Sequence, residues 1–166
     1  MFDGFLRVAA ATPDIRVADC SFNGASAAAL VSEAYEQGVS LLVLPELCLT
    51  GYTCSDLFLQ ESLLDGAGKA LLTLTEATRD KNMVVLAGLP LTVNGVLYNV
   101  AAVLHDGDIL GFVPKSYLPT YSEFYEGRHY HSGADIEADV LFNGRTYPFG
   151  TRLLFRCRQM PAFTLG

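Results

Sequence analysis

Two charged residues, Glu46 and Lys115, lie at the ends of predicted strands, where α/β enzymes often carry catalytic groups. Glu46 follows the apolar run SLLVLP at 40–45, and Lys115 follows ILGFVP at 109–114, so each comes directly after a proline. Because ligands gather at the carboxyl ends of strands in open α/β sheets, we expect both side chains at a site. A carboxylate and an ammonium brought together there could act as general base and oxyanion stabiliser. For either residue alone, a solvated charge at a strand end is the alternative.

The segment after Lys115 is rich in aromatic residues. It reads SYLPTYSEFYEGRHYHSG at 116–133, with five aromatic side chains among glutamates, an arginine and two histidines. Aromatic walls with a few polar groups are typical of small-molecule pockets, although a loop packed by its own aromatics gives the same pattern. No nearby cysteine completes a tetrahedral set of ligands with His129 and His131. We therefore do not expect a metal site.

No residue presents itself as a nucleophile. The four cysteines, Cys20, Cys48, Cys54 and Cys157, lack CxxC spacing, so we expect structural thiols in a reducing compartment. The nearby carboxylate of Glu46 would raise the pKa of the Cys48 thiol and make it less reactive. DGAGKA at 65–70 lacks the remaining residues of a phosphate loop and lies in a helical pattern. The residues alone thus give a base and an oxyanion group.

The elements that position these residues follow from periodicity. The first half alternates strands and helices. We expect a strand at 5–11, followed by a helix through 27–35 that stops at Gly38. A strand at 40–45, buried on both faces, and a helix from 63 to about Asn82, which Ser55-Asp56 could cap, should follow. A further buried strand is expected at 83–89. Asn94-Gly95 and Asp106-Gly107 then predict two hairpins. This order predicts an α/β fold with a mixed sheet, helices on one face, and a single domain.

Composition excludes several classes of protein. The chain has 166 residues, a net charge of −7 and only one short basic cluster, at Arg152, Arg156 and Arg158, so we expect no nucleic-acid partner. No apolar run approaches the ~20 residues that cross a membrane, and the N-terminus is unlike a secretion signal, which predicts a cytoplasmic protein. Charged residues make up 17%, against roughly 25% in typical domains. Either much of the surface is covered, or part of the domain lies outside this sequence.

Three stretches carry a family resemblance. LPELCLTGY at 44–52, GFVPKSYLPTYSEFYEGRHY at 111–130 and FGTRLLF at 149–155 closely resemble the N-terminal glutaminase domain of glutamine-dependent NAD synthetases, within the nitrilase superfamily. The resemblance runs through nearly all of residues 1–166. It implies a four-layer α-β-β-α sandwich, incomplete at its C-terminal side.

The resemblance also implies roles for individual residues. Glu46 would be the general base and Lys115 the group that stabilises the tetrahedral intermediate of a Glu-Lys-Cys triad. Tyr121 would help to bind glutamine, and Glu126 would match a second carboxylate that orients the site. The nucleophilic cysteine of the family follows a strand that begins about where PAFTLG ends the chain, and none of the four cysteines matches it. We therefore expect the fragment alone to be inactive.

Partners and cofactors follow from the same resemblance. Glutamine would be the substrate, and the released ammonia would amidate ATP-activated deamido-NAD in a C-terminal synthetase domain that the 166 residues lack. ATP and Mg²⁺ would belong to that domain, with no cofactor in this fragment, and members of the superfamily usually form homo-oligomers. Two alternatives stay open: a stand-alone amidase with another substrate, and a non-catalytic scaffold that kept the fold.

Overall fold

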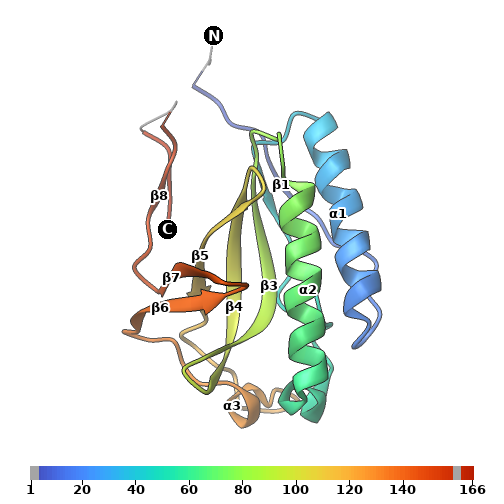
Figure 1. Cartoon of the computed structure of the whole chain (residues 1–166), viewed down its shortest axis with the longest axis vertical. Coiled ribbons are helices and arrows are strands. Elements are labelled where there is room, and N and C mark those ends of the chain that lie inside the picture. The colour runs from blue at the N-terminus through green and yellow to red at the C-terminus, as the bar shows by residue number, and fades with distance from the viewer. Residues whose placement is uncertain (1–3, 159–161) are drawn as a thin grey trace.

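A seven-stranded mixed sheet with two helices on one face forms the body of the molecule (Figure 1). The computed structural model describes residues 4–158 and 162–166. Helices α1 (Cys20–Glu36) and α2 (Glu61–Ala77) pack against each other. In spatial order the strands are β1 (Val8–Ala10), β2 (Leu41–Val43), β3 (Val84–Val93), β4 (Val96–His105), β5 (Asp108–Pro114), β7 (Arg145–Gly150) and β6 (Glu137–Phe142). The predicted α/β class with a mixed sheet is confirmed.

The direction of the strands changes where the sequence predicts hairpins. β1, β2 and β3 are parallel, β3, β4 and β5 form an antiparallel meander, and β7 joins β5 in parallel. At the first turn Asn94 and Gly95 have φ of 51° and 79°, and at the second Asp106 and Gly107 have 49° and 75°. Two consecutive positive φ angles are the signature of a type I′ turn, which matches the twist of the strands it joins. Both hairpins are confirmed.

The helix ends differ from the prediction around α2. Ser55 and Asp56 begin a separate 3₁₀ helix, η1 (Ser55–Leu59), and Gln60 precedes α2 without a side-chain cap. The helix also ends at Ala77 rather than near Asn82, and at Asp80 the backbone has a φ of 57°, which lies in the left-handed region and cannot continue a right-handed helix. By contrast, α1 stops before Gly38, at φ 73°, as predicted.

The core lies between the sheet and its two helices. Leu42, Val85, Ala102 and Phe112 are fully buried there. Their strand neighbours point to the opposite face because side chains alternate along a strand. On that face Val43 is 39% exposed, so the expectation that strand 40–45 is buried on both faces was wrong for the described residues. A continuous apolar run predicts a strand, but it does not show how many of its faces are covered.

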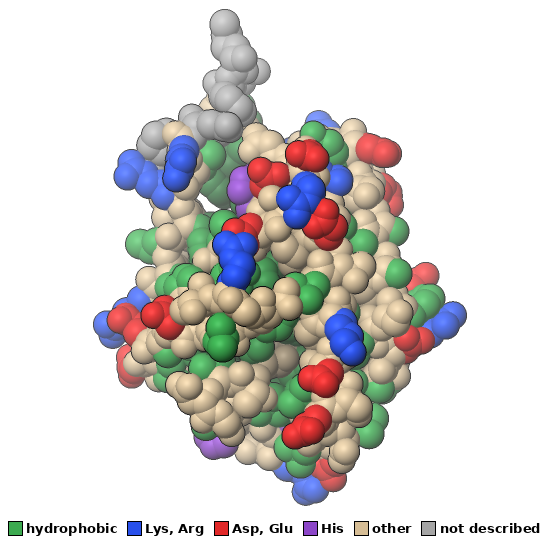
Figure 2. All heavy atoms as spheres, in the orientation of Figure 1, with side chains coloured by type: hydrophobic (Ala, Val, Ile, Leu, Met, Phe, Trp, Pro, Cys, Tyr) green, Lys and Arg blue, Asp and Glu red, His purple; other side chains and the backbone are tan. Residues whose placement is uncertain are grey.

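Three short elements of the described chain, β8 (Phe155–Arg156), β9 (Thr164–Leu165) and α3 (Glu126–His129), lie outside this body. Strands β8 and β9 pair with each other in a separate sheet, and α3 lies near η1. A cavity of about 630 Å³ separates the β8 segment from the main sheet, visible as a hollow in Figure 2. The main sheet and its helices correspond to two layers of the expected four-layer sandwich. The other two layers remain an expectation.

Charged side chains are scattered over the molecule and often paired. Figure 2 shows acidic and basic groups interspersed on the visible face. In the predicted basic cluster, Arg152 lies 3.6 Å from Asp135 and 4.0 Å from Glu137, which offsets its charge. Of the helices in the described ranges, none has the length and apolar character that a membrane span requires.

Candidate active site

The loop after β2 brings Glu46 to the edge of a cavity. Leu44 continues the pairing with β3, donating from its N–H to the Leu86 carbonyl at 2.9 Å, and the chain then turns. Gly88 of β3 makes this close approach possible, because a Cβ at that position would lie 2.3 Å from the Leu47 nitrogen. The backbone around Glu46 is therefore held directly against the sheet.

Lys115 is held from both sides through its backbone. It follows the last residue of β5, and its N–H donates to the Asn99 carbonyl of β4 at 2.8 Å. Its own carbonyl accepts from the Gly133 N–H at 2.9 Å. The strand register that aligns β4 with β5 thus sets the position from which the lysine side chain extends.

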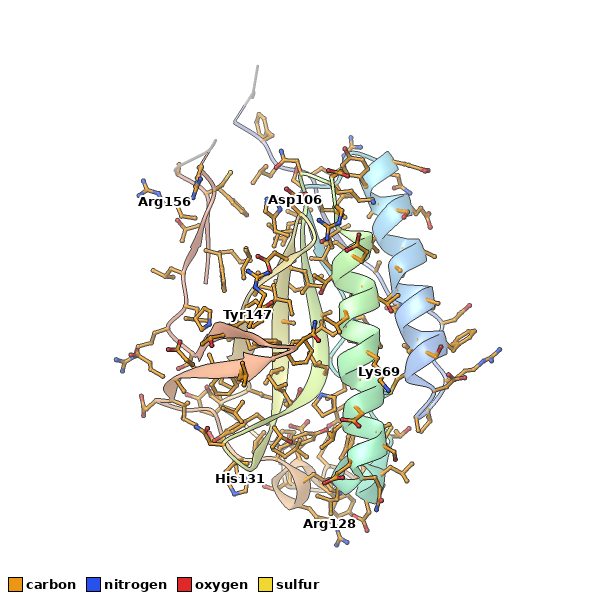
Figure 3. The ribbon with its side chains drawn as sticks, in the orientation of Figure 1. Lys69, Asp106, Arg128, His131, Tyr147 and Arg156 are labelled. Carbon is orange, nitrogen blue, oxygen red and sulfur yellow. The ribbon has the colours of Figure 1, made fainter. Side chains whose placement is uncertain are left out.

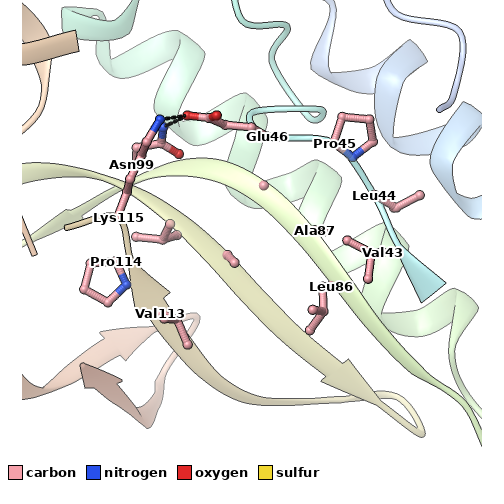
Figure 4. A pocket seen from close by; sticks show the side chains of 13 residues that line it. Val43, Leu44, Pro45, Glu46, Leu86, Ala87, Asn99, Val113, Pro114 and Lys115 are labelled. Atoms are coloured by element: carbon pink, nitrogen blue, oxygen red, sulfur yellow. Dashed lines mark hydrogen bonds and ion pairs between the residues drawn. The ribbon is translucent and has the colours of Figure 1, made fainter. Parts of the chain in front are cut away.

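The two predicted residues meet. Lys115 Nζ lies 2.7 Å from Glu46 Oε1 and 2.9 Å from Glu126 Oε1, so one ammonium bridges two carboxylates. Glu126 is only 5% exposed, whereas the Glu46 side chain is 40% exposed. Figure 4 shows Glu46, Asn99 and Lys115 together at one end of a cavity of about 310 Å³ whose walls are mostly apolar. Its apolar lining includes Val43, Leu86, Ala101 and Val113, on the sheet face away from the helices.

The electrostatics of this cluster define what Lys115 can do. Burial by itself lowers the pKa of the Lys115 ammonium, but its hydrogen bonds to Glu46 and Glu126 outweigh burial and raise that pKa above its ordinary value. The side chain therefore stays protonated at neutral pH and donates hydrogen bonds. It suits the stabilisation of a developing oxyanion, which leaves Glu46 as the group able to accept a proton.

Tyr52 holds Glu126 from the other side. Its hydroxyl donates to Glu126 Oε1 at 2.6 Å, the same oxygen that Lys115 contacts. Burial, followed by this hydrogen bond, raises the pKa of Tyr52, so the phenol remains a donor. Glu126 Oε2 is buried and has no hydrogen-bond partner among the residues described. The carboxylate is thus oriented by its Oε1 alone.

A second cavity lies beyond Glu126. It has a volume of about 440 Å³, and its walls include Tyr52, Phe58, Tyr125, Glu126 and Tyr130. At its rim Arg128 donates twice to the Asp56 carboxylate, both at 2.9 Å, and His129 Nε2 lies 3.1 Å from Asp56. Figure 3 shows Arg128 at the α3 end of the molecule. The aromatic segment thus lines a cavity, and its rings also pack on one another, as those of Tyr121 and Phe124 do, so both interpretations describe part of it.

Tyr121 lies at the surface of the described structure, and its role in binding glutamine stays a prediction. Its side chain is 70% exposed, and its ring packs edge-on against Phe124 with centroids 5.8 Å apart. Phe124 in turn packs edge-on against Tyr52 at 6.5 Å. Among the contacts of the described residues, Tyr121 reaches the Lys115 cluster through these two rings.

Two residues of the cluster were missed by sequence reasoning. Asn99 is 3% exposed and donates from its side-chain amide to Glu46 Oε1, and Tyr52 contacts Glu126 as described. A signal was present for Asn99, since an amide within the apolar strand YNVAAVL must find a hydrogen-bond partner. Tyr52 ends the LPELCLTGY motif but carried no separate indication of its partner.

The cysteines provide no reactive thiol at this cluster. Cys20, Cys48 and Cys54 are buried, and burial raises the pKa of Cys20 and of Cys48 to about 11. For Cys48 the cause differs from the one expected: burial raises its pKa, and backbone hydrogen bonds at Gly88 and at Cys48 itself oppose that rise, without a contribution from Glu46. A raised pKa disfavours the reactive thiolate, and a structural role for these thiols stays a prediction.

Comparisons with known proteins show the family to which the chain belongs. The model of the family described as carbon-nitrogen hydrolase matches residues 7–153. The glutamine-dependent NAD(+) synthetase of Mycobacterium bovis is 43% identical over 162 residues, which is 98% of this chain and 24% of that protein. The chain therefore spans about a quarter of the length of the curated relatives it matches.

Solved structures show the same relationship. A glutamine-dependent NAD(+) synthetase from Cytophaga hutchinsonii superposes with a TM-score of 0.85 at 28% identity, over 92% of this chain and 26% of that one. An amidase of the nitrilase superfamily from Nesterenkonia shares the fold, with a TM-score of 0.64 at 24% identity over 86% of this chain and 54% of its own. The resemblance read from the three motifs is confirmed, and the chain belongs to the carbon-nitrogen hydrolase family.

Proposed function

We propose that this chain supplies the general base and the oxyanion-stabilising lysine of a glutamine amide hydrolase, as the glutaminase part of a glutamine-dependent NAD synthetase. The observation that carries the proposal is the bridge from Lys115 Nζ to Glu46 and Glu126, at 2.7 and 2.9 Å, at the end of a cavity. The similarity to glutamine-dependent NAD(+) synthetases over almost the whole chain supports glutamine as the substrate.

The chemistry begins with a proton transfer. Glu46 takes the proton of a cysteine thiol, and the thiolate sulfur attacks the carboxamide carbon of glutamine. The carbonyl oxygen becomes an oxyanion that Lys115 stabilises. The C–N bond then breaks, and the nitrogen leaves as ammonia after receiving the proton from Glu46.

A second half-reaction restores the enzyme. Water attacks the thioester after giving a proton to Glu46, and glutamate and the free thiol are released. In this scheme Glu126 keeps Lys115 oriented and stays unchanged. The nucleophile is a cysteine other than Cys20, Cys48, Cys54 and Cys157, so the fragment alone is proposed to be inactive.

The later steps of the proposal involve groups beyond these 166 residues. We assign ATP and Mg²⁺ to a synthetase domain that receives the ammonia. Within the described residues, the segment DGAGKA at 65–70 does not form a phosphate-binding loop. Its glycines lie inside α2, where their N–H groups make the hydrogen bonds of the helix. A cytoplasmic location and a homo-oligomeric assembly belong to the same proposal.

The test is ammonia release by the product of the complete gene, beside the purified 166-residue chain. We expect the complete product to release ammonia from glutamine and the 166-residue chain to release none. Hydrolysis of short aliphatic amides but not of glutamine would favour a stand-alone amidase, and no hydrolysis at all would favour a scaffold. Glutamine hydrolysis by the 166-residue chain, at a rate removed by Glu46→Ala, would contradict the proposed absence of a nucleophile.

A further inference from the structure

One residue, Asn99, contacts both members of the Glu46–Lys115 pair. Its side-chain amide donates to Glu46 Oε1, and its backbone carbonyl accepts from the Lys115 N–H at 2.8 Å. Figure 4 shows the Asn99 amide and the Lys115 ammonium converging on the Glu46 carboxylate. A single residue of β4 thus connects a loop after β2 to the end of β5.

We propose that Asn99 is a positioning residue that fixes the Glu46 carboxylate against Lys115 and leaves Glu46 Oε2 as the oxygen that takes the proton. The inference rests on the proposed function, in which Glu46 is the base. It adds an assignment of which oxygen is basic and of the group that selects it.

The selection follows from counting lone pairs. A carboxylate offers about four acceptor positions, roughly two on each oxygen. Glu46 Oε1 already accepts from two donors, the Asn99 amide and the Lys115 ammonium. Glu46 Oε2 has no hydrogen-bond partner within residues 4–158 and 162–166, and the side chain is 40% exposed at the cavity. Glu46 Oε2 is therefore the oxygen of this carboxylate that is free to accept the proton of a thiol in that cavity.

The cost of burying Asn99 also points to a positioning role. Asn99 is 3% exposed and lies in β4 between Tyr98 and Val100, both of which belong to the core. A buried amide destabilises a fold unless its hydrogen bonds are made, so an apolar residue would serve the strand equally well. The amide is satisfied by the carboxylate of Glu46 rather than by the sheet itself.

The inference can be tested on the 166-residue chain by NMR. Reductive ¹³C-methylation labels the lysines, of which the chain has three, Lys69, Lys81 and Lys115. The pH titration of the Lys115 resonance then reports how closely Glu46 is held against it. We use Asn99→Val, which suits a strand, and Asn99→Ser as a second variant that also lacks the amide. Glu46→Gln and the double variant Asn99→Val/Glu46→Gln complete the set.

A matched control separates a positioning role of Asn99 from a general loss of stability in this part of the fold. Asn23 is also buried, and it supports the same loop by donating to the Leu49 carbonyl at 3.3 Å. Asn23→Ala should lower stability without moving the Lys115 titration. Circular dichroism on every variant identifies any that has unfolded.

The expected result is directional. Asn99→Val and Asn99→Ser should lower the Lys115 titration midpoint by about half a pH unit, roughly a threefold rise in its acid dissociation constant. Glu46→Gln should lower it at least as far, and the double variant should match Glu46→Gln, because Asn99 acts through Glu46.

Three results would overturn the inference, and they are distinguishable. If Glu46→Gln shifts Lys115 while both Asn99 variants leave it unchanged, Asn99 does not position the base and the proposed function stands. If Asn23→Ala shifts Lys115 as far as Asn99→Val does, the effect is general loosening. If Glu46→Gln leaves Lys115 unchanged, the ion pair itself is absent, and the proposed function fails together with the inference.

Discussion

Lys115 Nζ lies 2.7 Å from Glu46 Oε1, although the two residues are 69 positions apart in the sequence. The contact exists because β2 and β5 belong to one sheet, and the segments that follow these two strands turn at the same end of the cavity. With Glu126 also on Lys115, two carboxylates share one ammonium.

The first prediction concerns the protonation of Lys115. Its hydrogen bonds to the two glutamates raise its pKa in the folded chain despite partial burial, so the ¹³C-methylated amine should titrate at a higher pH in the folded protein than in urea. Stability from this group is fully present below the unfolded pKa of about 10.4 and is lost as the pH rises through the folded pKa. Equal titration in both states would show that the bridge does not form in solution.

The second prediction concerns the hydrogen bond from Tyr52 to Glu126. Tyr52→Phe removes a donor to a buried carboxylate and should lower the free energy of unfolding by about 1–2 kcal/mol, measured by urea denaturation. Tyr35→Phe is the matched control, since Tyr35 is 42% exposed against 38% for Tyr52 and its hydroxyl has no such partner among the described residues. Equal losses in the two variants would count against a role for the Tyr52 hydroxyl.

The sequence predicted the parts of the fold that depend on local pattern. Both hairpins were found because Asn-Gly and Asp-Gly accept two positive φ angles, which few other pairs do. The start of α2 was missed because Ser55 and Asp56 have the right residue types for a cap, whereas the chain uses them in η1. Burial of one face only was also missed, since apolar strands look alike whether one or both faces are covered.

The same limits apply to the site. Glu46 and Lys115 were found because each is a charge directly after a strand, and Glu126 came only from the family resemblance. Asn99 was missed because its meaning depends on register: it reads as an interruption of an apolar strand until β4 is aligned with Lys115. Contacts that depend on strand alignment are not visible in the residue pattern.

The third prediction concerns the glycine that lets the Glu46 loop approach β3. Gly88→Ala would put a Cβ 2.3 Å from the Leu47 nitrogen and 2.8 Å from Glu46 Cα, so backbone must move, and we expect a loss of about 3 kcal/mol in stability. Gly68→Ala in α2 is the control: its Cβ would meet Phe142 at an ordinary 3.5 Å, and the helix should gain about 0.5–1 kcal/mol. If thermal denaturation shows no difference between them, the loop is not held as described.

The fourth prediction concerns thiol reactivity. Cys20, Cys48 and Cys54 are buried with raised pKa values, whereas Cys157 is partly exposed. With a thiol-reactive disulfide at pH 8, one thiol per chain should react quickly and the other three only after denaturation. Cys157→Ser should remove the fast phase. A fast phase that persists in this variant would reveal a reactive thiol among the buried three, and with it a possible nucleophile.

The central claim is that Glu46 is the general base of an amide hydrolase. Its most direct test is the rate of ammonia release from glutamine by the complete gene product, compared between wild type, Glu46→Gln and the control Glu33→Gln on α1. General acid–base groups contribute about 10²–10⁴-fold, so Glu46→Gln should lose at least about a hundredfold in rate while Glu33→Gln keeps it. A Glu46→Gln protein that is folded and releases ammonia at the wild-type rate would contradict the account.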